Sequence, residues 1–205
     1  MEPFETFEHA GFTIELHQDT DPESPRGWCN ATEMVCWHGR YDLGDRQPNS
    51  TERDALERGG LPLLERYLRL VEGVVAFRPL GLIDHSGISM YVGGGAHWSD
   101  SAGWDSGTVG FAYVTKDRAD ELGVPDPEKA IEVEVQTYDN YLTGRVAGYL
   151  LRDNEDTFGG CWGFYPDDEG DGLEYLRAEA RSEAEYERDQ RAAAANQDIP
   201  TRGAA

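Results

Sequence analysis

Histidine, carboxylate and hydroxyl side chains stand together at one point of the sequence, and these residue types could carry chemistry. Asp84, His85 and Ser86 are the three residue types of a hydrolase triad, but they are consecutive. Because neighbouring side chains diverge, these three cannot form a linear Ser–His–Asp relay among themselves. A catalytic site would have to be assembled from separate segments, with a histidine as base, an aspartate to orient it, and Ser106 or Cys161 as nucleophile.

The candidate site residues stand mainly at predicted strand ends and turns, where sites are commonly built. The candidate catalytic residues are His38, Asp84, His85 and Asp105. The candidate binding residues are Arg40, Trp104 and Cys161. We expect His38, Arg40, Asp84, His85 and Asp105 to converge near one end of a sheet. The commoner alternative is a set of polar turns fixed by Asp and Ser side-chain hydrogen bonds.

Neither a metal nor a nucleotide is predicted as a cofactor. Cys36 and His38 would share one face of a strand, about 6.6 Å apart along it, but no further paired ligand spacing supports a metal site. The glycine-rich segment 93–107 matches neither a dinucleotide nor a P-loop motif and has no lysine. The simplest interpretation of this segment is a flexible connection pinned by Trp98 and Trp104. The cysteines, Cys29, Cys36 and Cys161, are expected to be free thiols.

The chain is strongly acidic. Its 205 residues include 40 Asp and Glu against 18 Lys and Arg, for a net charge of -22, and only Lys116 and Lys129 are lysines. This balance argues against binding to duplex nucleic acid or to an anionic membrane, because phosphate affinity comes from clustered Lys and Arg. Two interpretations of the acidity remain open: a surface adapted to molar salt, and mimicry of DNA by carboxylates spaced like phosphates.

Adaptation to salt predicts that folding depends on ionic strength. Lowering potassium chloride from molar concentration to about 0.1 M lengthens electrostatic screening from about 3 to about 10 Å and is expected to unfold the protein through self-repulsion. Thermal unfolding followed by circular dichroism at both concentrations measures this. An unchanged melting temperature would refute salt adaptation.

The hydrophobic pattern predicts an α+β protein built on a mainly antiparallel sheet. Helices are expected near residues 51–72 and 127–143, although alternating apolar residues make a strand possible at the start of the second. Thr51 and Asp54 form a capping signal for the first helix, and the pair Gly59 and Gly60 would break it. Asp126 and Pro127 mark the start of the second. Residues 1–170 are predicted to form a single domain. Residues 171–197 form an exposed acidic and alanine-rich helix that packs only at its start, and residues 198–205 a disordered tail. Strands are expected in segments 12–17, 34–38, 74–83, 87–92, 108–115, 146–151 and 160–164.

The location expected from the sequence is the cytoplasm of a host cell. No apolar run approaches the roughly 20 residues that cross a bilayer. The N-terminus lacks the basic and apolar regions of a signal peptide.

Five short motifs follow one another along residues 12–165. They are MVCWHGRYDLGD at 34–45, DHSG at 84–87, WDSGTVGF at 104–111, TYDNYLTG at 137–144 and CWGF at 161–164. Their order resembles an uncharacterised family of proteins encoded by viruses, plasmids and prophages of bacteria and archaea. The resemblance implies an origin in a mobile genetic element and brings no activity or cofactor. With the lysine-poor acidity, it favours a haloarchaeal virus or plasmid.

Three functions are compatible with these observations. The leading hypothesis is a non-enzymatic accessory or interaction protein of a mobile element that binds a host or viral protein, without membrane or direct nucleic-acid binding. The second is a small hydrolase or transferase that uses the His and Asp cluster. The third is an acidic DNA mimic, whose carboxylates would form a continuous stripe.

Overall fold

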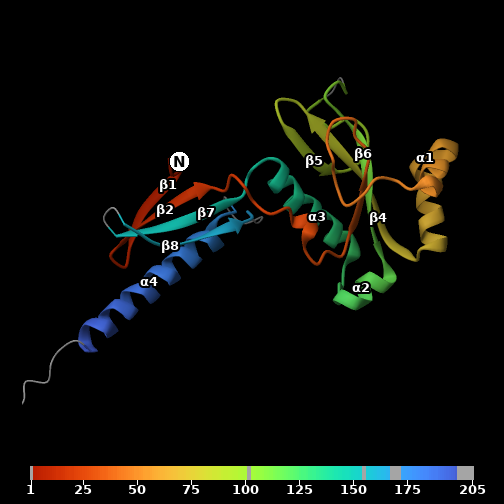
Figure 1. Ribbon diagram of the computed structural model, residues 1–205. Coiled ribbons are helices and arrows are strands. Elements are labelled where there is room, and N and C mark those ends of the chain that lie inside the picture. The colour runs from red at the N-terminus through yellow and green to blue at the C-terminus, as the bar shows by residue number, and fades with distance from the viewer. Residues whose placement is uncertain (1, 101–102, 154–155, 167–171, 198–205) are drawn as a thin grey trace, which may run out of the picture. The chain divides into compact units, whose positions relative to one another are not determined.

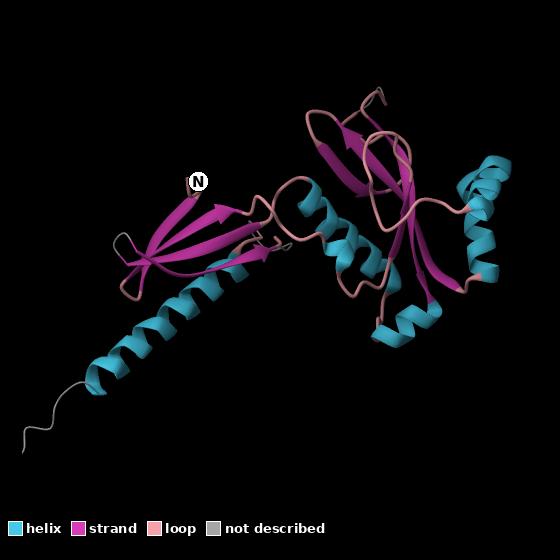
Figure 2. Ribbon diagram, in the orientation of Figure 1, coloured by secondary structure: helices cyan, strands magenta, loops and turns pink. Residues whose placement is uncertain are grey.

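The computed structural model describes residues 2–100, 103–153, 156–166 and 172–197. Within them it has four α-helices and eight strands in two antiparallel sheets (Figures 1 and 2), so the predicted α+β class is confirmed. Contacts divide the chain into two compact units, where the sequence suggested one domain over residues 1–170. The terminal unit comprises Met1–Pro22 and Gly144–Ala205, and the central unit comprises Glu23–Thr143.

The terminal unit is a four-stranded sheet with one helix along a face (Figure 1). Its strand order is β1-β2-β7-β8, and all neighbours are antiparallel. Ala10 and Gly11, both with positive φ, make the tight turn between the first two strands. The elements are β1 (Glu5–His9), β2 (Phe12–Gln18), β7 (Ala147–Asp153), β8 (Asp156–Phe164) and α4 (Glu174–Gln197).

Helix α4 packs along more of its length than the sequence predicts. Leu176, Ala180 and Ala184 recur at helical spacing and are buried against the β2 and β7 side chains. Further along, the guanidinium of Arg191 lies 2.6 Å from an Asp153 carboxylate oxygen. The prediction that this helix packs only at its start is therefore wrong. The later turns pack through small alanines and paired charges, whereas the prediction counted only large apolar residues as packing positions. The predicted tail 198–205 lies outside the described residues.

The central unit is a four-stranded sheet covered on both faces. Its strand order is β3-β6-β4-β5, again antiparallel. Its strands are β3 (Glu33–Cys36), β4 (Val74–Asp84), β5 (Ile88–Val92) and β6 (Ser106–Thr115). Its helices are α1 (Ser50–Val71), α2 (Lys116–Leu122), α3 (Pro127–Leu142) and the short 3-10 helix η1 (Pro25–Gly27).

Alternation along the strands divides the core of the central unit between the two faces of its sheet. Phe111 and Tyr113 of β6 pack with Leu64 and Leu68 of α1. Ala112 and Val114 face the other way, toward α3 and its buried residues Ile131, Val135 and Tyr138. The two helices thus lie on opposite faces, which leaves the ends of the strands free to carry loops.

Local sequence signals account for the two long helices of the central unit, α1 and α3. The N-cap of α1 is Asn49, in a reciprocal capping box with Glu52, in place of the predicted Thr51 and Asp54 pair. At Gly60 the backbone leaves the helical region (φ 65, ψ -162), so the predicted break at the glycine pair is confirmed as a kink. Helix α3 begins after Asp126, and the alternative strand in this segment is wrong.

Three elements were not predicted: β1, α2 and the short 3-10 helix η1. Strand β1 is short, and Phe7 is its only large apolar residue. It is recognisable as a strand mainly because it pairs with β2. Helix α2 has seven residues capped by Thr115 and ends at Gly123 in the left-handed conformation. Among the described helices, none has the length and apolar character needed to cross a bilayer.

Candidate functional site

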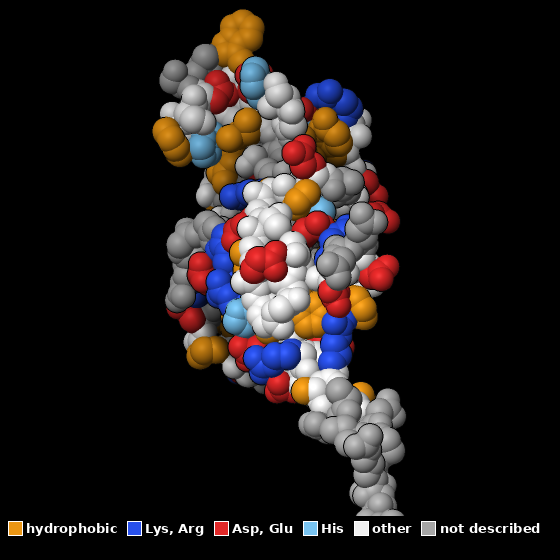
Figure 3. All heavy atoms as spheres, turned by 90° about the vertical axis from the view of Figure 1, so that its left-hand side faces the viewer, with side chains coloured by type: hydrophobic (Ala, Val, Ile, Leu, Met, Phe, Trp, Pro, Cys, Tyr) orange, Lys and Arg blue, Asp and Glu red, His pale blue; other side chains and the backbone are white. Residues whose placement is uncertain are grey.

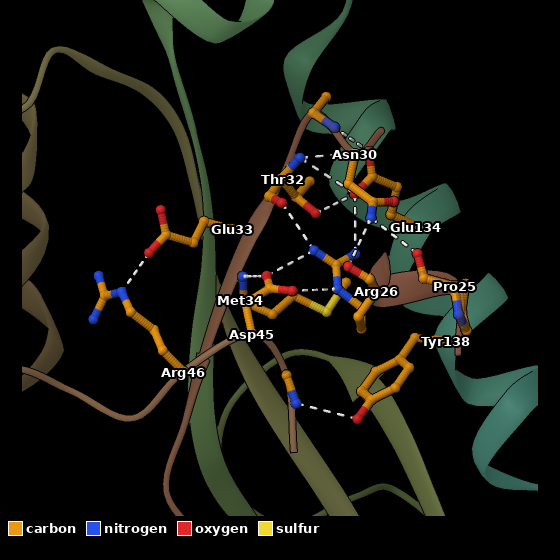
Figure 4. A network of polar contacts seen from close by, with 12 residues as sticks. Pro25, Arg26, Asn30, Thr32, Glu33, Met34, Asp45, Arg46, Glu134 and Tyr138 are labelled. Atoms are coloured by element: carbon orange, nitrogen blue, oxygen red, sulfur yellow. Dashed lines mark hydrogen bonds and ion pairs between the residues drawn. The ribbon is translucent and has the colours of Figure 1, made fainter. Parts of the chain in front are cut away.

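Arg26, a buried arginine drawn with its polar contacts in Figure 4, anchors the loop that precedes Asp45. That loop carries His38 and Arg40. Arg26 of η1 is 7% exposed and donates two hydrogen bonds to the Asp45 carboxylate, Nε at 3.0 Å and Nη2 at 2.7 Å. Asp45 also accepts from the Met34 backbone N–H at 2.7 Å, while its own N–H donates to the Met34 carbonyl. Both ends of loop 37–45 are thereby tied to β3.

Glu134 of α3 holds the other side of Arg26. Its carboxylate accepts from Arg26 Nη1 at 3.2 Å, from the backbone N–H groups of Ala31 and Thr32 and from the Thr32 hydroxyl. Burial alone would lower the pKa of Arg26, but the hydrogen bonds and charges of Asp45 and Glu134 outweigh it and raise that pKa. Because Arg26 Nε, Nη1 and Nη2 all donate within the chain, this cluster stabilises the fold and is not a ligand site.

Three candidate residues meet at the end of the central sheet. Arg40 Nη2 donates to Asp84 Oδ2 at 2.5 Å, and His38 Nε2 lies 4.0 Å from the same oxygen. The His38 ring stacks on Tyr41, with the ring centroids 5.0 Å apart. The strand order explains why these residues lie together. Strands β3 and β4 flank β6, and both end at the end of the sheet where β6 begins.

The hydrogen bonds of His38 argue against a role as a general base. Its Nδ1 accepts from the backbone N–H groups of Arg40 and Tyr41, at 3.2 and 3.3 Å. The proton of the neutral ring is therefore on Nε2, which faces Asp84. Since neither nitrogen is left to take a proton from a substrate, this histidine organises its loop.

His85 and Asp105 form a second pair beside the first. His85 Nδ1 lies 3.0 Å from Asp105 Oδ2, and the Asp84 N–H donates to the Asp105 carbonyl at 2.7 Å. The His85 side chain is 71% exposed. A proton-transfer pair this exposed to water lacks the water-free environment that strengthens electrostatic catalysis.

The tryptophan loop, residues 93–105 without 101–102, connects β5 to β6 and is held by side-chain hydrogen bonds. The N–H groups of Gly95 and His97 donate to the hydroxyls of Thr108 and Ser106, at 2.8 and 2.9 Å. Asp100 accepts from the Ser106 hydroxyl at 2.8 Å and from the Asp105 N–H at 2.9 Å. The Ser106 and backbone donors lower the pKa of Asp100, which favours its charged form.

The tryptophans of this loop point into solvent. Trp98 is 87% exposed and Trp104 is 88% exposed. The sequence-based interpretation, a flexible connection pinned by its tryptophans, is therefore wrong: polar groups hold the loop, and the indoles are left free. Large aromatic side chains on a held loop are typical of a protein-binding surface.

Tyr91 of β5 supports the loop from beneath. Its hydroxyl donates to the Gly95 carbonyl at 2.7 Å, and its ring lies edge-on to His97 with the centroids 4.7 Å apart. The ring has room because it crosses Gly81 of β4, where a Cβ would come within 2.1 Å of a ring carbon. Burial of the Tyr91 phenol is the main cause of its raised pKa.

The Gly81→Ala substitution should therefore disturb the tryptophan loop. We expect it to displace Tyr91, to cost about 1 to 3 kcal/mol of unfolding free energy, and to speed amide hydrogen exchange in residues 93–100. Hydrogen exchange followed by mass spectrometry measures this, with Gly107→Ala as the control because nothing lies within 4 Å of a Cβ there. Unchanged exchange in the loop of the Gly81→Ala variant would contradict the role of Tyr91.

The two further cysteine candidates, Cys36 and Cys161, belong to different units. Cys161 is an exposed residue of β8 in the terminal unit. Cys36 is buried, and this burial, with the nearby charge of Asp45, raises the pKa of its thiol to about 12. In the described part of the chain, no group of three or more His, Cys, Asp or Glu side chains is placed to hold a metal ion.

Charges of both signs are mixed on the face of the molecule that Figure 3 shows. On the face drawn in Figure 3, Asp and Glu side chains are interspersed with Lys and Arg. In the central unit several arginines pair with neighbouring carboxylates, as Arg46 does with buried Glu52 at 2.7 Å. The face in Figure 3 therefore has no continuous carboxylate stripe of the kind a DNA mimic needs.

Comparisons with known proteins returned no match to a protein-family model, to a curated protein or to a solved structure. The site is consequently interpreted from its own geometry. Sequence reasoning named Trp104 but missed Trp98 as a surface residue, and it missed Arg26 and Glu134. Two tryptophans within a short segment of glycines and polar residues, where little apolar sequence could bury them, were the available signal for the exposed pair.

Proposed function

We propose that this protein is a non-enzymatic interaction protein of a mobile genetic element, and that it binds a host or viral protein through the tryptophan loop. The exposure of Trp98 and Trp104, 87% and 88%, is the observation that carries the proposal. Burying these indoles is worth more than burying any other side chain of the loop, and tryptophan is enriched among the residues that dominate binding energy.

The order in the loop adds to this support. Asp100, Ser106 and Thr108 hold the loop through hydrogen bonds, and Tyr91 supports it. A partner would therefore meet indoles on a backbone that is already ordered, so that less conformational entropy is lost on binding. The five sequence motifs and the lysine-poor acidity suggest a haloarchaeal virus or plasmid as the source, and the host cytoplasm as the place of action.

A pull-down from a haloarchaeal lysate at molar potassium chloride tests the proposal. The baits are the full chain, the Trp98→Ala/Trp104→Ala variant, the His38→Ala/His85→Ala variant and Tyr186→Ala. Tyr186 is a matched control, since it is an aromatic residue that is 60% exposed on α4 in the terminal unit. We expect a protein captured by the full chain to be lost only with the tryptophan variant. Equal capture by the tryptophan variant would contradict the proposal.

A small hydrolase or transferase is the second candidate function. The pair of His85 and Asp105, 3.0 Å apart, favours it, because histidine and carboxylate pairs can transfer protons. Screening the full chain against chromogenic ester and phosphoester substrates tests this candidate. Activity that is lost in the His38→Ala/His85→Ala variant, and kept in the tryptophan variant, would replace the binding proposal.

A further inference from the structure

We propose that the partner segment bound by the tryptophan loop is basic, with arginine side chains stacked on Trp98 and Trp104 and paired with the aspartates around the loop. This inference rests on the proposed function and specifies the chemistry of the partner. Exposed aromatic faces and acidic groups occur together at this end of the central sheet.

The indoles provide the stacking surface. Tryptophan is the best aromatic partner for a cation, and a planar guanidinium stacks on it more readily than a strongly hydrated ammonium. Trp98 also contacts the His97 ring, with centroids 5.3 Å apart, and His97 in turn contacts Tyr91. This row of rings favours one orientation of Trp98 and leaves its outer surface exposed.

The chain itself shows how such contacts are made elsewhere. The guanidinium carbon of Arg191 lies 4.0 Å from the centroid of the Phe158 ring, and that of Arg40 lies 5.4 Å from the centroid of Tyr41. Among the residues that the structure describes, no arginine or lysine lies over Trp98 or Trp104. The two largest exposed aromatic faces of the central unit are therefore available to a cation from another molecule.

The charge around the loop selects a basic segment. Asp100 and Asp105 lie in the loop itself, and Asp84 contacts Asp105 through a backbone hydrogen bond. Asp84 is paired with the guanidinium of Arg40, and Asp105 is paired with the exposed His85. Because molar salt screens charges over about 3 Å, the net charge of -22 steers a partner only at lower salt, and direct contact with these carboxylates has to select the basic segment.

The proposal is tested with synthetic peptides and the full chain. The probe is a fluorescein-labelled ten-residue peptide of alternating arginine and glycine. In a matched peptide each arginine is replaced by citrulline, which keeps the planar shape and removes the charge. Binding is measured by fluorescence anisotropy, at the lowest potassium chloride concentration at which circular dichroism shows each protein folded. The variants are Trp98→Ala/Trp104→Ala, Asp105→Asn and Tyr186→Ala.

We expect the arginine peptide to bind at least about tenfold more tightly than the citrulline peptide. The tryptophan variant should weaken arginine-peptide binding by about tenfold, Asp105→Asn by about twofold to fivefold, and Tyr186→Ala by less than about twofold. Equal binding of the arginine and citrulline peptides would overturn the proposal. So would equal binding by the full chain and the tryptophan variant, since the acidic surface alone would then attract the peptide.

The outcome is separable from that of the pull-down. If the tryptophan variant loses its protein partner in the lysate but binds the arginine peptide normally, the loop binds protein and the basic-segment proposal is wrong. If the variant loses the peptide as well as the lysate partner, both proposals are supported.

Discussion

The Glu134→Ala variant is expected to lose about 3 to 5 kcal/mol of unfolding free energy. The substitution removes the acceptor for the N–H groups of Ala31 and Thr32 and for the Thr32 hydroxyl. It also removes one of two carboxylates that neutralise Arg26, which is only 7% exposed. Asp45 still neutralises Arg26, but Arg26 Nη1 and the donors of Ala31 and Thr32 lose their acceptor. Buried donors without partners are among the costliest defects that one substitution can cause.

Urea unfolding at molar potassium chloride, followed by circular dichroism and tryptophan fluorescence, measures this loss. Glu132→Ala is the matched control, because Glu132 is a glutamate of the same helix, 49% exposed and paired only at its surface with Lys129. The control should change the unfolding free energy by less than about 0.5 kcal/mol. Similar stability of the two variants would show that the Arg26 cluster does not stabilise the central unit.

The Gly148→Ala variant is expected to destabilise the terminal unit by about 2 to 3 kcal/mol. Gly148 lies in β7 beneath the indole of Trp162, and an added Cβ would come within 2.3 Å of that ring and 2.7 Å of the Cys161 carbonyl oxygen. The ring can move aside only with loss of its packing, and the carbonyl belongs to the neighbouring strand β8. Overpacking of this kind separates paired strands.

Thermal unfolding followed by circular dichroism measures the effect, and Gly107→Ala again provides the control. Gly107 is also a strand residue, but nothing lies within 4 Å of a Cβ built there. The Gly107→Ala melting temperature should stay within about 2 °C of the parent protein, and that of Gly148→Ala should fall by several degrees. A Gly148→Ala variant that melts with the parent would show that Trp162 does not pack on β7 in solution.

Much of the fold followed from local patterns in the sequence. Alternating apolar residues located most of the strands, and Asp126, Pro127 and the glycines near residue 60 marked helix boundaries. The grouping of strands into two units could not be predicted, because it depends on pairing between residues far apart. Strand β2 pairs with β7, so that Ile14 lies opposite Leu151. No local pattern encodes such a partner.

The candidate site, like the fold, could be predicted only in part from the sequence. His38, Arg40, Asp84, His85 and Asp105 do lie together, since antiparallel neighbours bring their ends to one edge of the sheet. The chemistry open to these residues depends on hydrogen bonds that the sequence does not predict. One example is the pair of hydrogen bonds that two backbone N–H groups donate to His38 Nδ1.

The exposed tryptophans were the least predictable part of the site. Tryptophan is highly buried on average, so composition favours a core role for Trp98 and Trp104. Their exposure follows from the bonds of Asp100, Ser106 and Thr108, which hold the loop without help from the indoles.

The most direct measurement of binding through the tryptophan loop is photo-crosslinking from position 98. The full chain carrying p-benzoylphenylalanine in place of Trp98 is irradiated in haloarchaeal lysate at molar potassium chloride, beside the same substitution at Tyr186. We predict a discrete crosslinked protein from position 98 that is absent from position 186. Crosslinking that is the same from both positions, or none from position 98, would contradict binding through this loop.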